Sequence, residues 1–303
     1  MTAAGGLWVY AGPRGFGVLV KHGGTYWISV KNDDARISPS MRLALQGAPP
    51  VRPGRFEWRQ IAPGFETAEL PVLAESGEVD RILLARIDPA SFRFEVRNAP
   101  AKNKTLDQWM TSLGAALVIN GSYYSRQGTP DTPLVSNGTR LGPEKYDAKA
   151  GAFVASANSV GIRDLADEDW RSALSGADNA MVSYPLLVSK NPERHPVPKS
   201  RWLANRSFVG QDKSGWIVLG TTTDAFFSLS RLAEFLRDAP LDLTSALNLD
   251  GGPVACQGIS LNGFERRASG QWELQADDNG AKLLTWPYGT MARMPIVLAV
   301  FPR

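Results

Sequence analysis

Cysteine and histidine are scarce in this chain of 303 residues, and their scarcity excludes several kinds of site. The single cysteine, Cys256, excludes an intramolecular disulfide and a cysteine-based metal centre. The two histidines, His22 and His195, are too few for a multi-histidine metal site. Oxygen ligands could still hold a hard divalent cation, so a site of that kind stays open.

Long apolar runs are also absent, and no stretch of the sequence is suited to span a membrane. Residues 3–12 are small and apolar, but they lack the basic segment and the longer apolar run of a complete signal sequence. A trimmed signal or anchor sequence would leave such a remnant. This interpretation predicts a periplasmic, envelope or secreted protein.

The net charge of +3 is unevenly distributed along the chain. Residues 1–60 contain eight Lys or Arg and three Asp or Glu, whereas the remaining residues contain 25 and 27. The main body therefore lacks the basic excess of a nucleic-acid-binding groove. The basic N-terminal arm fits either association with an anionic membrane surface or an ordinary solvated segment.

Composition and local patterns predict an α+β protein with mixed, mainly antiparallel sheets and a few flanking helices. The Gly- and Pro-rich residues 47–54 form a linker, which divides a basic arm or small subdomain at 1–54 from a catalytic domain at 55–303. Capping residues and helical spacing predict helices at 38–45, 105–113 and from Ser228 onward. A short acidic helix is expected near 167–174, a bulged or edge strand at 181–188, and a long loop over the site at 125–150.

The stretch at residues 247–252, Leu-Asn-Leu-Asp-Gly-Gly, is the strongest candidate for a functional turn. An apolar run typical of a buried strand ends here at a carboxylate and two glycines. Glycines allow positive φ and the close approach of another group, so Asp250 would stand at the rim of a sheet beside open space. The alternative is a tight turn in which Asp250 bonds its own backbone.

Two further stretches also place a polar or charged side chain at the end of a predicted strand. Residues 115–124 are an apolar strand that ends at Asn120 and a glycine, and residues 205–212 place Arg206 at the start of another strand. Functional groups gather where a rigid sheet holds strand ends and loops. We therefore expect these three strand ends to form one site.

In this order and spacing, the motifs resemble the phosphodiester glycosidases related to the lysosomal mannose-6-phosphate uncovering enzyme. The resemblance covers roughly residues 80–303. The matching stretches are residues 105–113, 119–124, 184–188, 206–210, the helix from Ser228, and residues 247–252.

The resemblance implies hydrolysis of the bond between the anomeric carbon of a sugar and a phosphodiester oxygen. In that reaction Asp250 would stabilise or attack the anomeric centre, Arg206 would bind the phosphate and Asn120 would orient the sugar. Backbone N–H groups at the glycine turns would add phosphate donors. The other residues expected to bind substrate are Asn248, Gly121, Ser122, Tyr123, Tyr124, Ser207, Gly251 and Gly252.

The sequence departs from the family pattern at two positions. Pro253 and Val254 follow the turn where the family has glycine and serine, which removes two potential phosphate donors, and Ser122 replaces the second glycine of an Asn-Gly-Gly motif. No second carboxylate stands out, although Asp131, Asp212 and Asp224 could serve as partners of Asp250 or as turn residues.

Two other functions therefore stay open. One is an ordinary glycoside hydrolase that uses two carboxylates on a neutral glycan, and the other is a non-catalytic glycan-binding envelope protein. His195 could act as an acid or base by residue type, but its proline-rich loop and lack of an evident partner indicate a surface residue. Neither the sugar nor a requirement for a divalent cation follows from the sequence.

Overall fold

The computed structural model describes residues 7–12, 15–20, 26–31, 33–47, 49–100, 104–147, 150–277, 280–285 and 292–303. The chain is predominantly β, with 46% of residues in mostly antiparallel sheets and 14% in helices. The expected sheets and few helices are therefore present, with more β structure than the α+β prediction implied. His22 lies outside the described residues.

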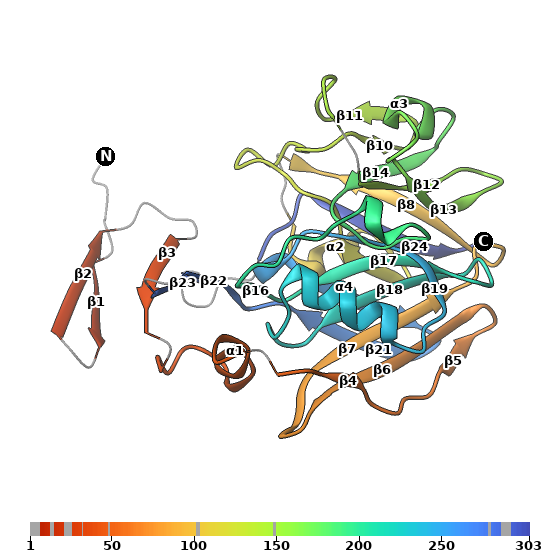
Figure 1. The fold of residues 1–303 in the computed structure, drawn as a ribbon. Coiled ribbons are helices and arrows are strands. Elements are labelled where there is room, and N and C mark those ends of the chain that lie inside the picture. The colour runs from red at the N-terminus through yellow and green to blue at the C-terminus, as the bar shows by residue number, and fades with distance from the viewer. Residues whose placement is uncertain are drawn as a thin grey trace, which may run out of the picture.

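Two stacked sheets form the centre of the molecule (Figure 1). The first has eight strands in the order β15-β19-β17-β18-β7-β6-β4, with β5 also paired to β6. Its strands are β4 (Arg52–Pro53), β5 (Arg59–Ala62), β6 (Phe65–Ala74), β7 (Gly77–Ile87), β15 (Leu186–Val188), β17 (Ser207–Asp212), β18 (Ile217–Thr222) and β19 (Leu243–Asn248). The second has five strands in the order β21-β20-β9-β24-β8. Its strands are β8 (Phe92–Asn98), β9 (Leu117–Asn120), β20 (Cys256–Leu261), β21 (Phe264–Ser269) and β24 (Ile296–Pro302).

Strand periodicity explains how these sheets pack. In β9, Leu117 and Ile119 join the core between the two sheets, whereas Val118 faces the opposite way toward helix α2 (Leu106–Leu113). The eight-stranded sheet likewise buries its other face under α1 (Pro39–Leu45) and α4 (Leu229–Asp238). The result is a sandwich of two sheets with helices on both outer faces.

The helix predictions are confirmed with their caps. The Ser38 side chain accepts a hydrogen bond from the Met41 N–H at 3.1 Å, and Thr105 forms a capping box with Gln108. Ser228 occupies the N-cap position of α4 but makes no side-chain capping bond there. The acidic segment near residue 170 forms only the short helix α3 (Trp170–Ala173).

A third sheet, in the order β11-β10-β14-β12-β13, lies above the sandwich in Figure 1. Its strands are β10 (Leu134–Ser136), β11 (Thr139–Leu141), β12 (Gly151–Ala155), β13 (Val160–Asp164) and β14 (Asn179–Ser183). The segment predicted as a long loop at 125–150 thus contains two strands. The predicted strand at 181–188 is also two strands in different sheets, because the chain leaves β14 after Ser183 and joins the eight-stranded sheet at β15.

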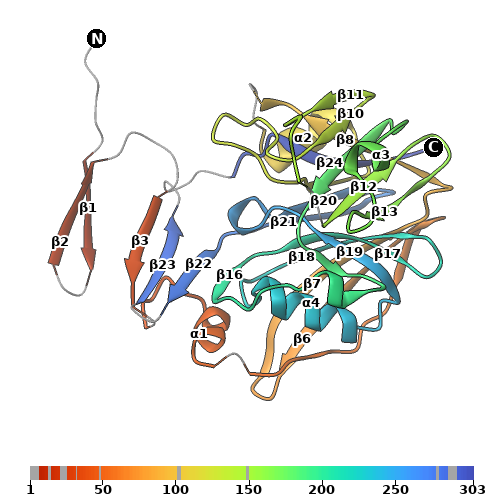
Figure 2. The same cartoon turned by 45° about the horizontal axis from the view of Figure 1, so that its top comes forward.

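A fourth sheet, in the order β16-β22-β23-β3, extends from one side of the sandwich (Figure 2). Its strands are β3 (Tyr26–Val30), β16 (Trp202–Ala204), β22 (Glu273–Asp277) and β23 (Gly280–Thr285). Among the strands that the structure describes, β1 (Leu7–Gly12) and β2 (Gly15–Val20) pair only with each other. Because β3 pairs with β23, the N-terminal region joins a sheet built mainly from distant parts of the chain, and the domain division at residue 54 stays a prediction.

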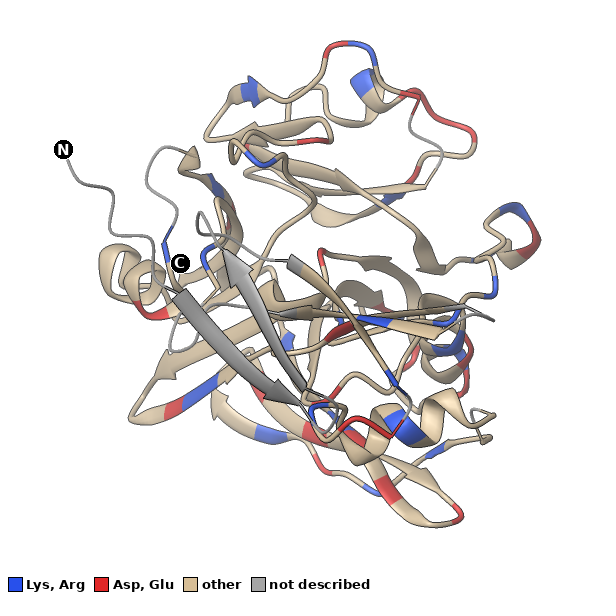
Figure 3. Ribbon diagram, turned by 90° about the vertical axis from the view of Figure 1, so that its left-hand side faces the viewer, with Lys and Arg blue, Asp and Glu red and all other residues tan. Residues whose placement is uncertain are grey.

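Charged residues are interspersed on the ribbon rather than gathered by sign (Figure 3). Among the described residues, no helix has the length and apolar character needed to cross a membrane.

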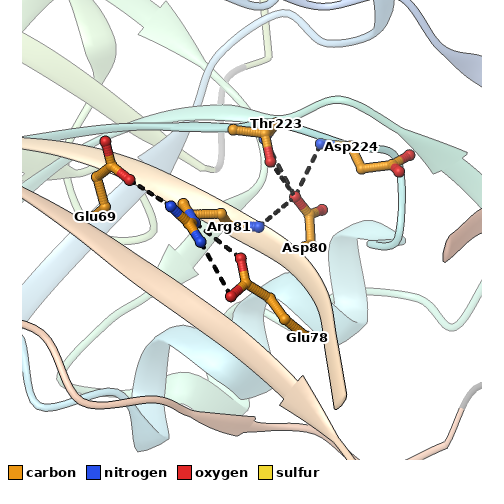
Figure 4. Close-up of polar contacts among 6 residues, drawn as sticks. All are labelled: Glu69, Glu78, Asp80, Arg81, Thr223 and Asp224. Carbon is orange, nitrogen blue, oxygen red and sulfur yellow. Dashed lines mark hydrogen bonds and ion pairs between the residues drawn. The ribbon is translucent and has the colours of Figure 1, made fainter. Parts of the chain in front are cut away.

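Asp80 is a buried carboxyl group in β7, next to Thr223 and Asp224 (Figure 4). Its Oδ1 accepts hydrogen bonds from the N–H groups of Arg81, Thr223 and Asp224 at 2.7, 3.2 and 2.9 Å. Its Oδ2 has no partner among the described residues. Burial raises the pKa of Asp80 to about 8 and outweighs the backbone donors, which lower it.

As the pH rises from about 5 to about 8, we expect the free energy of unfolding to fall less in the Asp80→Asn variant than in the parent. The folded parent keeps a proton that the unfolded chain releases near pH 4, so its stability falls across this interval, at most by ~1.4 kcal/mol per pH unit. Asparagine keeps the accepting oxygen and does not ionise. Denaturant midpoints at several pH values measure the effect, with the exposed Asp107→Asn as control. Equal pH slopes for the parent and Asp80→Asn would contradict the assignment.

Candidate functional site

Three strand ends meet at one edge of the sandwich, as the sequence predicted. β9 ends at Asn120 in the five-stranded sheet, and β19 and β17 are neighbours in the eight-stranded sheet. The Asp250 N–H donates to the Gly121 carbonyl at 3.0 Å, and the Gly252 N–H donates to the Asn205 carbonyl at 2.8 Å. The turn at 250–252 is therefore bonded to both of the other strand ends.

Gly252 is required at this turn for two reasons. Its φ is +69°, a conformation that side chains with a Cβ rarely adopt. A Cβ at this position would also lie only 2.4 Å from Oε2 of Glu273. The chain then forms a single 3-10 turn at Gly252–Val254 and enters β20, so this segment passes from one sheet of the sandwich to the other.

The side chain of Asn120 clamps this crossing. Its Nδ2 donates to the Asp250 carbonyl at 2.7 Å, and its Oδ1 accepts from the Cys256 N–H at 3.1 Å. Both ends of the amide thus bind the backbone on either side of the 3-10 turn, in a buried position. Asn120 holds the Asp250 turn in place, and its predicted contact with a sugar stays a prediction.

Asp250 is a partly accessible carboxylate among buried groups. Its Oδ1 accepts from the Gly251 N–H at 2.9 Å, so the tight-turn interpretation is correct for that oxygen. Burial raises the pKa of Asp250 to about 7 against the effect of this N–H, and the charge of Glu273 raises it further. The opposite charge of Arg206 lowers the pKa. The carboxyl group therefore ionises near neutral pH.

Arg206 is a buried cation. Two of its nitrogen atoms bind backbone carbonyls, and the third lies near the Asp250 turn. Its Nη2 donates to the Trp202 carbonyl at 2.7 Å and its Nε to the Phe227 carbonyl at 3.3 Å. Nη1 forms no hydrogen bond with the described residues, and a Cβ at Gly251 would lie 3.3 Å from it. The guanidinium is thus fixed with one donor facing the Asp250 turn.

Glu273 is a second carboxylate that sequence reasoning missed. It begins β22, its Oε1 accepts from Trp202 Nε1 at 2.9 Å, and its Oε2 lies against Gly252. Burial raises the pKa of Glu273, while Trp202 and Arg206 lower it. A single acid in an alternating strand is typical of a solvated face, so no local signal identifies it. Only the pairing of β22 with β16 brings Glu273 to the turn.

Tyr123, Asn248 and Tyr184 form a polar and aromatic cluster beside Asp250. Asn248 Nδ2 donates to the Tyr123 hydroxyl at 2.7 Å, and that hydroxyl donates to the Tyr184 carbonyl at 2.8 Å. The Tyr123 and Tyr184 rings stack with centroids 4.5 Å apart. Since Tyr184 is 47% exposed and covers Tyr123, the accessible ring belongs to Tyr184, which was not among the predicted site residues.

The remaining predicted contacts are engaged within the protein. Buried Ser122 accepts from the Thr132 hydroxyl, and buried Ser207 lies 3.2 Å from the Thr221 hydroxyl. Tyr124 donates to the Arg293 carbonyl at 3.3 Å. The N–H groups of residues 250–252 bind protein acceptors, which leaves them unavailable as the expected phosphate donors. Arg206 Nη1 is the donor that faces the turn.

The three proposed carboxylate partners have different surroundings. Asp212 binds Arg86 at 2.7 Å and two backbone N–H groups, and Asp224 accepts from the Ser38 hydroxyl at 2.7 Å. Both are therefore structural residues of turns. Asp131 is exposed, and its charge contributes to the raised pKa of Asp250, so it lies near the site. His195 lies 2.8 Å from the Asp164 carboxylate.

Among the described residues, no group of three or more His, Cys, Asp or Glu side chains is arranged to hold a metal ion. Whether a divalent cation binds at the site stays open, as it was from the sequence.

Comparisons with known proteins give one family match and several similar folds. Residues 113–256 match the model of the phosphodiester glycosidase family. A solved structure of the zebrafish N-acetylglucosamine-1-phosphodiester alpha-N-acetylglucosaminidase catalytic domain, auto-inhibited by its pro-peptide, is similar with a TM-score of 0.54 and 15% identity. That similarity covers 92% of this chain and 88% of the zebrafish chain.

A hypothetical protein from Synechocystis is similar with a TM-score of 0.52 and 17% identity, over 85% of this chain and 64% of that one. At these identities the likeness shows the fold alone. A comparison with curated protein sequences gave no match. The match to the family model covers Asn120, Arg206 and Asp250, and it confirms the resemblance to the phosphodiester glycosidases that the sequence predicted.

Proposed function

We propose that this protein hydrolyses the bond between the anomeric carbon of a sugar and a phosphodiester oxygen in a surface or envelope glycan. The observation that carries the proposal is the buried Arg206, whose Nη1 faces the turn of Asp250. A phosphodiester brings one negative charge, and a buried guanidinium binds such a group far better than a solvated one does. The match of residues 113–256 to the phosphodiester glycosidase family model supports the same reaction class.

The reaction breaks the bond between the anomeric carbon and the phosphate oxygen, and the electron pair leaves with that oxygen. Positive charge then develops on the sugar, where the ionised Asp250 stabilises it or forms a bond to the anomeric carbon. Water supplies the hydroxyl group of the released sugar. Because the phosphomonoester leaves as a stable anion, Arg206 can stabilise it without full protonation.

The cluster around Asn248 supports a sugar-binding role on the other side of Asp250. Asn248 Oδ1 is a buried acceptor without a partner among the described residues, which fits a hydrogen bond from a hydroxyl group. The exposed ring of Tyr184 offers an apolar face to a sugar ring. In this arrangement, the sugar lies toward Tyr184 and the phosphate toward Arg206.

Glu273 supports a second candidate, an ordinary glycoside hydrolase with two carboxylates. Asp250 and Glu273 both have raised pKa values, Glu273 is in contact with Gly252, and the charge of Glu273 raises the pKa of Asp250. A protonated carboxyl group could then donate its proton to an alkoxide leaving group, which a neutral glycan requires. The two candidates differ in the leaving group and therefore in the substrate that is cleaved.

We expect the purified protein to release sugar from glycosyl-1-phosphodiesters and not from matched neutral aryl glycosides. Asp250→Asn should lose at least 100-fold in kcat/KM, because the carboxylate interacts with the charge of the transition state. Mass spectrometry of the released sugar and phosphomonoester measures both. The exposed Asp107→Asn serves as the matched control, and the unfolding midpoint verifies that each variant folds.

Cleavage of neutral glycosides alone would replace the proposal with the second candidate. Unchanged turnover by folded Asp250→Asn would remove Asp250 from the mechanism. Binding of a sugar-phosphate polymer without turnover of any substrate would indicate a glycan-binding protein instead.

We expect kcat/KM to fall below about pH 7 as Asp250 becomes protonated, approaching tenfold per pH unit. Glu273→Gln should move this acidic limb to lower pH, because it removes a negative charge that raises the pKa of Asp250. Glutamine still accepts a hydrogen bond from Trp202. The control is Glu265→Gln, an exposed residue of β21. An acidic limb unmoved by Glu273→Gln would exclude this coupling.

We also propose that the protein acts in the periplasm, at the cell envelope or outside the cell, where a surface glycan is accessible. The basic N-terminal arm would then favour contact with an anionic membrane surface. Both ideas rest on the sequence, and fractionation of cells that express the full-length gene tests them.

A further inference from the structure

Three exposed aromatic side chains lie at the candidate site or next to it. The large hydrophobic side chains that are exposed among the described residues are Trp27, Tyr184 and Trp202. Tyr184 stacks on Tyr123 beside Asp250, and Trp202 binds Glu273 at 2.9 Å on the other side of the turn. Aromatic rings that stay exposed beside a polar site offer apolar faces to a ligand.

Strand register places Trp27, Trp202 and Glu273 on one face of the fourth sheet. Paired residues on neighbouring strands point to the same face. Trp202 pairs with Gln275, and Gln275 pairs with Lys282. Lys282 lies two residues from Leu284, which pairs with Trp27. Glu273 pairs with Ala204. Because side chains alternate along a strand, Trp202 and Ala204 point to the same side as Glu273. Leu203, Leu274, Leu283 and Ile28 occupy the opposite face, which packs on the core with α1 and α4.

The two indoles meet across the strands that separate them. Their centroids are 6.1 Å apart and their planes cross at 81°, although β22 and β23 lie between β16 and β3 (Figure 2). Each ring nevertheless stays 40% exposed. Trp202 is further fixed through the bond of its Nε1 to Glu273 and the bond of its carbonyl to Arg206. The pair is therefore an ordered aromatic surface that continues directly from the site.

Polar groups border these rings. Glu273, Gln275 and Lys282 point to the same face, and Gln275 and Lys282 are exposed. An apolar ring face edged by hydrogen-bonding groups suits a sugar ring, which has C–H faces and hydroxyl groups at its rim. A flat apolar protein surface would instead require a wider apolar patch than two indoles provide.

We infer that Trp27 and Trp202 form a carbohydrate-binding subsite for a glycan chain that extends beyond the scissile bond on the Arg206 side. The inference rests on the proposed function for its position relative to the reaction. The subsite depends on β3, which lies far outside residues 113–256, so the N-terminal region takes part in substrate binding. A long glycan gains this contact, and a small glycosyl phosphodiester does not reach it.

The test measures binding separately from turnover. Hexasaccharides of glucose, mannose and N-acetylglucosamine are titrated into the full chain, with calorimetry and indole fluorescence as readouts. We expect at least one to bind, Trp27→Ala to weaken its binding about fivefold or more, and Trp27→Phe to restore most of the affinity. The control is Trp216→Ala, since Trp216 lies at the other end of the β17–β18 hairpin from Ser207.

No binding of any hexasaccharide, or equal binding by folded Trp27→Ala and the parent, would overturn the subsite. Turnover of small glycosyl phosphodiesters by the parent protein is assayed in parallel. Turnover without Trp27-dependent binding would reject the subsite alone. Trp27-dependent binding without turnover would keep the subsite and reject the proposed reaction.

Discussion

The two hydrogen bonds of the Asn120 side chain hold together the region on which the site depends. One binds the Asp250 carbonyl and the other binds the Cys256 N–H, at the segment where the chain passes between the two central sheets. Each sheet is rigid because its inward residues share one buried core. The amide thus fixes the position of Asp250 relative to both sheets. The position of the Asp250 carboxylate therefore depends on the packing of the whole sandwich.

Charge around the turn is the second constraint. Arg206 is one buried cation close to two carboxylates, Asp250 and Glu273, whose pKa values burial has raised. Full ionisation of both carboxylates would leave the site negative and oppose an anionic phosphodiester. Since the backbone N–H groups of the turn are engaged, Arg206 supplies the positive charge that the proposed reaction requires.

Local patterns predicted the parts of this structure that depend on neighbouring residues. The caps of α1 and α2 and the meeting of three strand ends follow from short motifs. Glu273 and Trp27 could not be predicted, because β22 and β3 reach the site only through strand pairing over long sequence distances. The use of Asn120 as a clamp was equally hidden, since an amide after a strand also suits substrate binding. The split of residues 181–188 between two sheets depended on tertiary packing.

Hydrolysis of a glycosyl-1-phosphodiester in water enriched in ¹⁸O tests the central assignment most directly. Attack at the anomeric carbon leaves every original oxygen on the phosphate, whereas attack at phosphorus adds one oxygen from water. The account predicts a phosphomonoester product without ¹⁸O, because Asp250 acts at the anomeric carbon and Arg206 binds the leaving phosphate. A phosphomonoester that carries one ¹⁸O atom would contradict it and identify the enzyme as a phosphodiesterase.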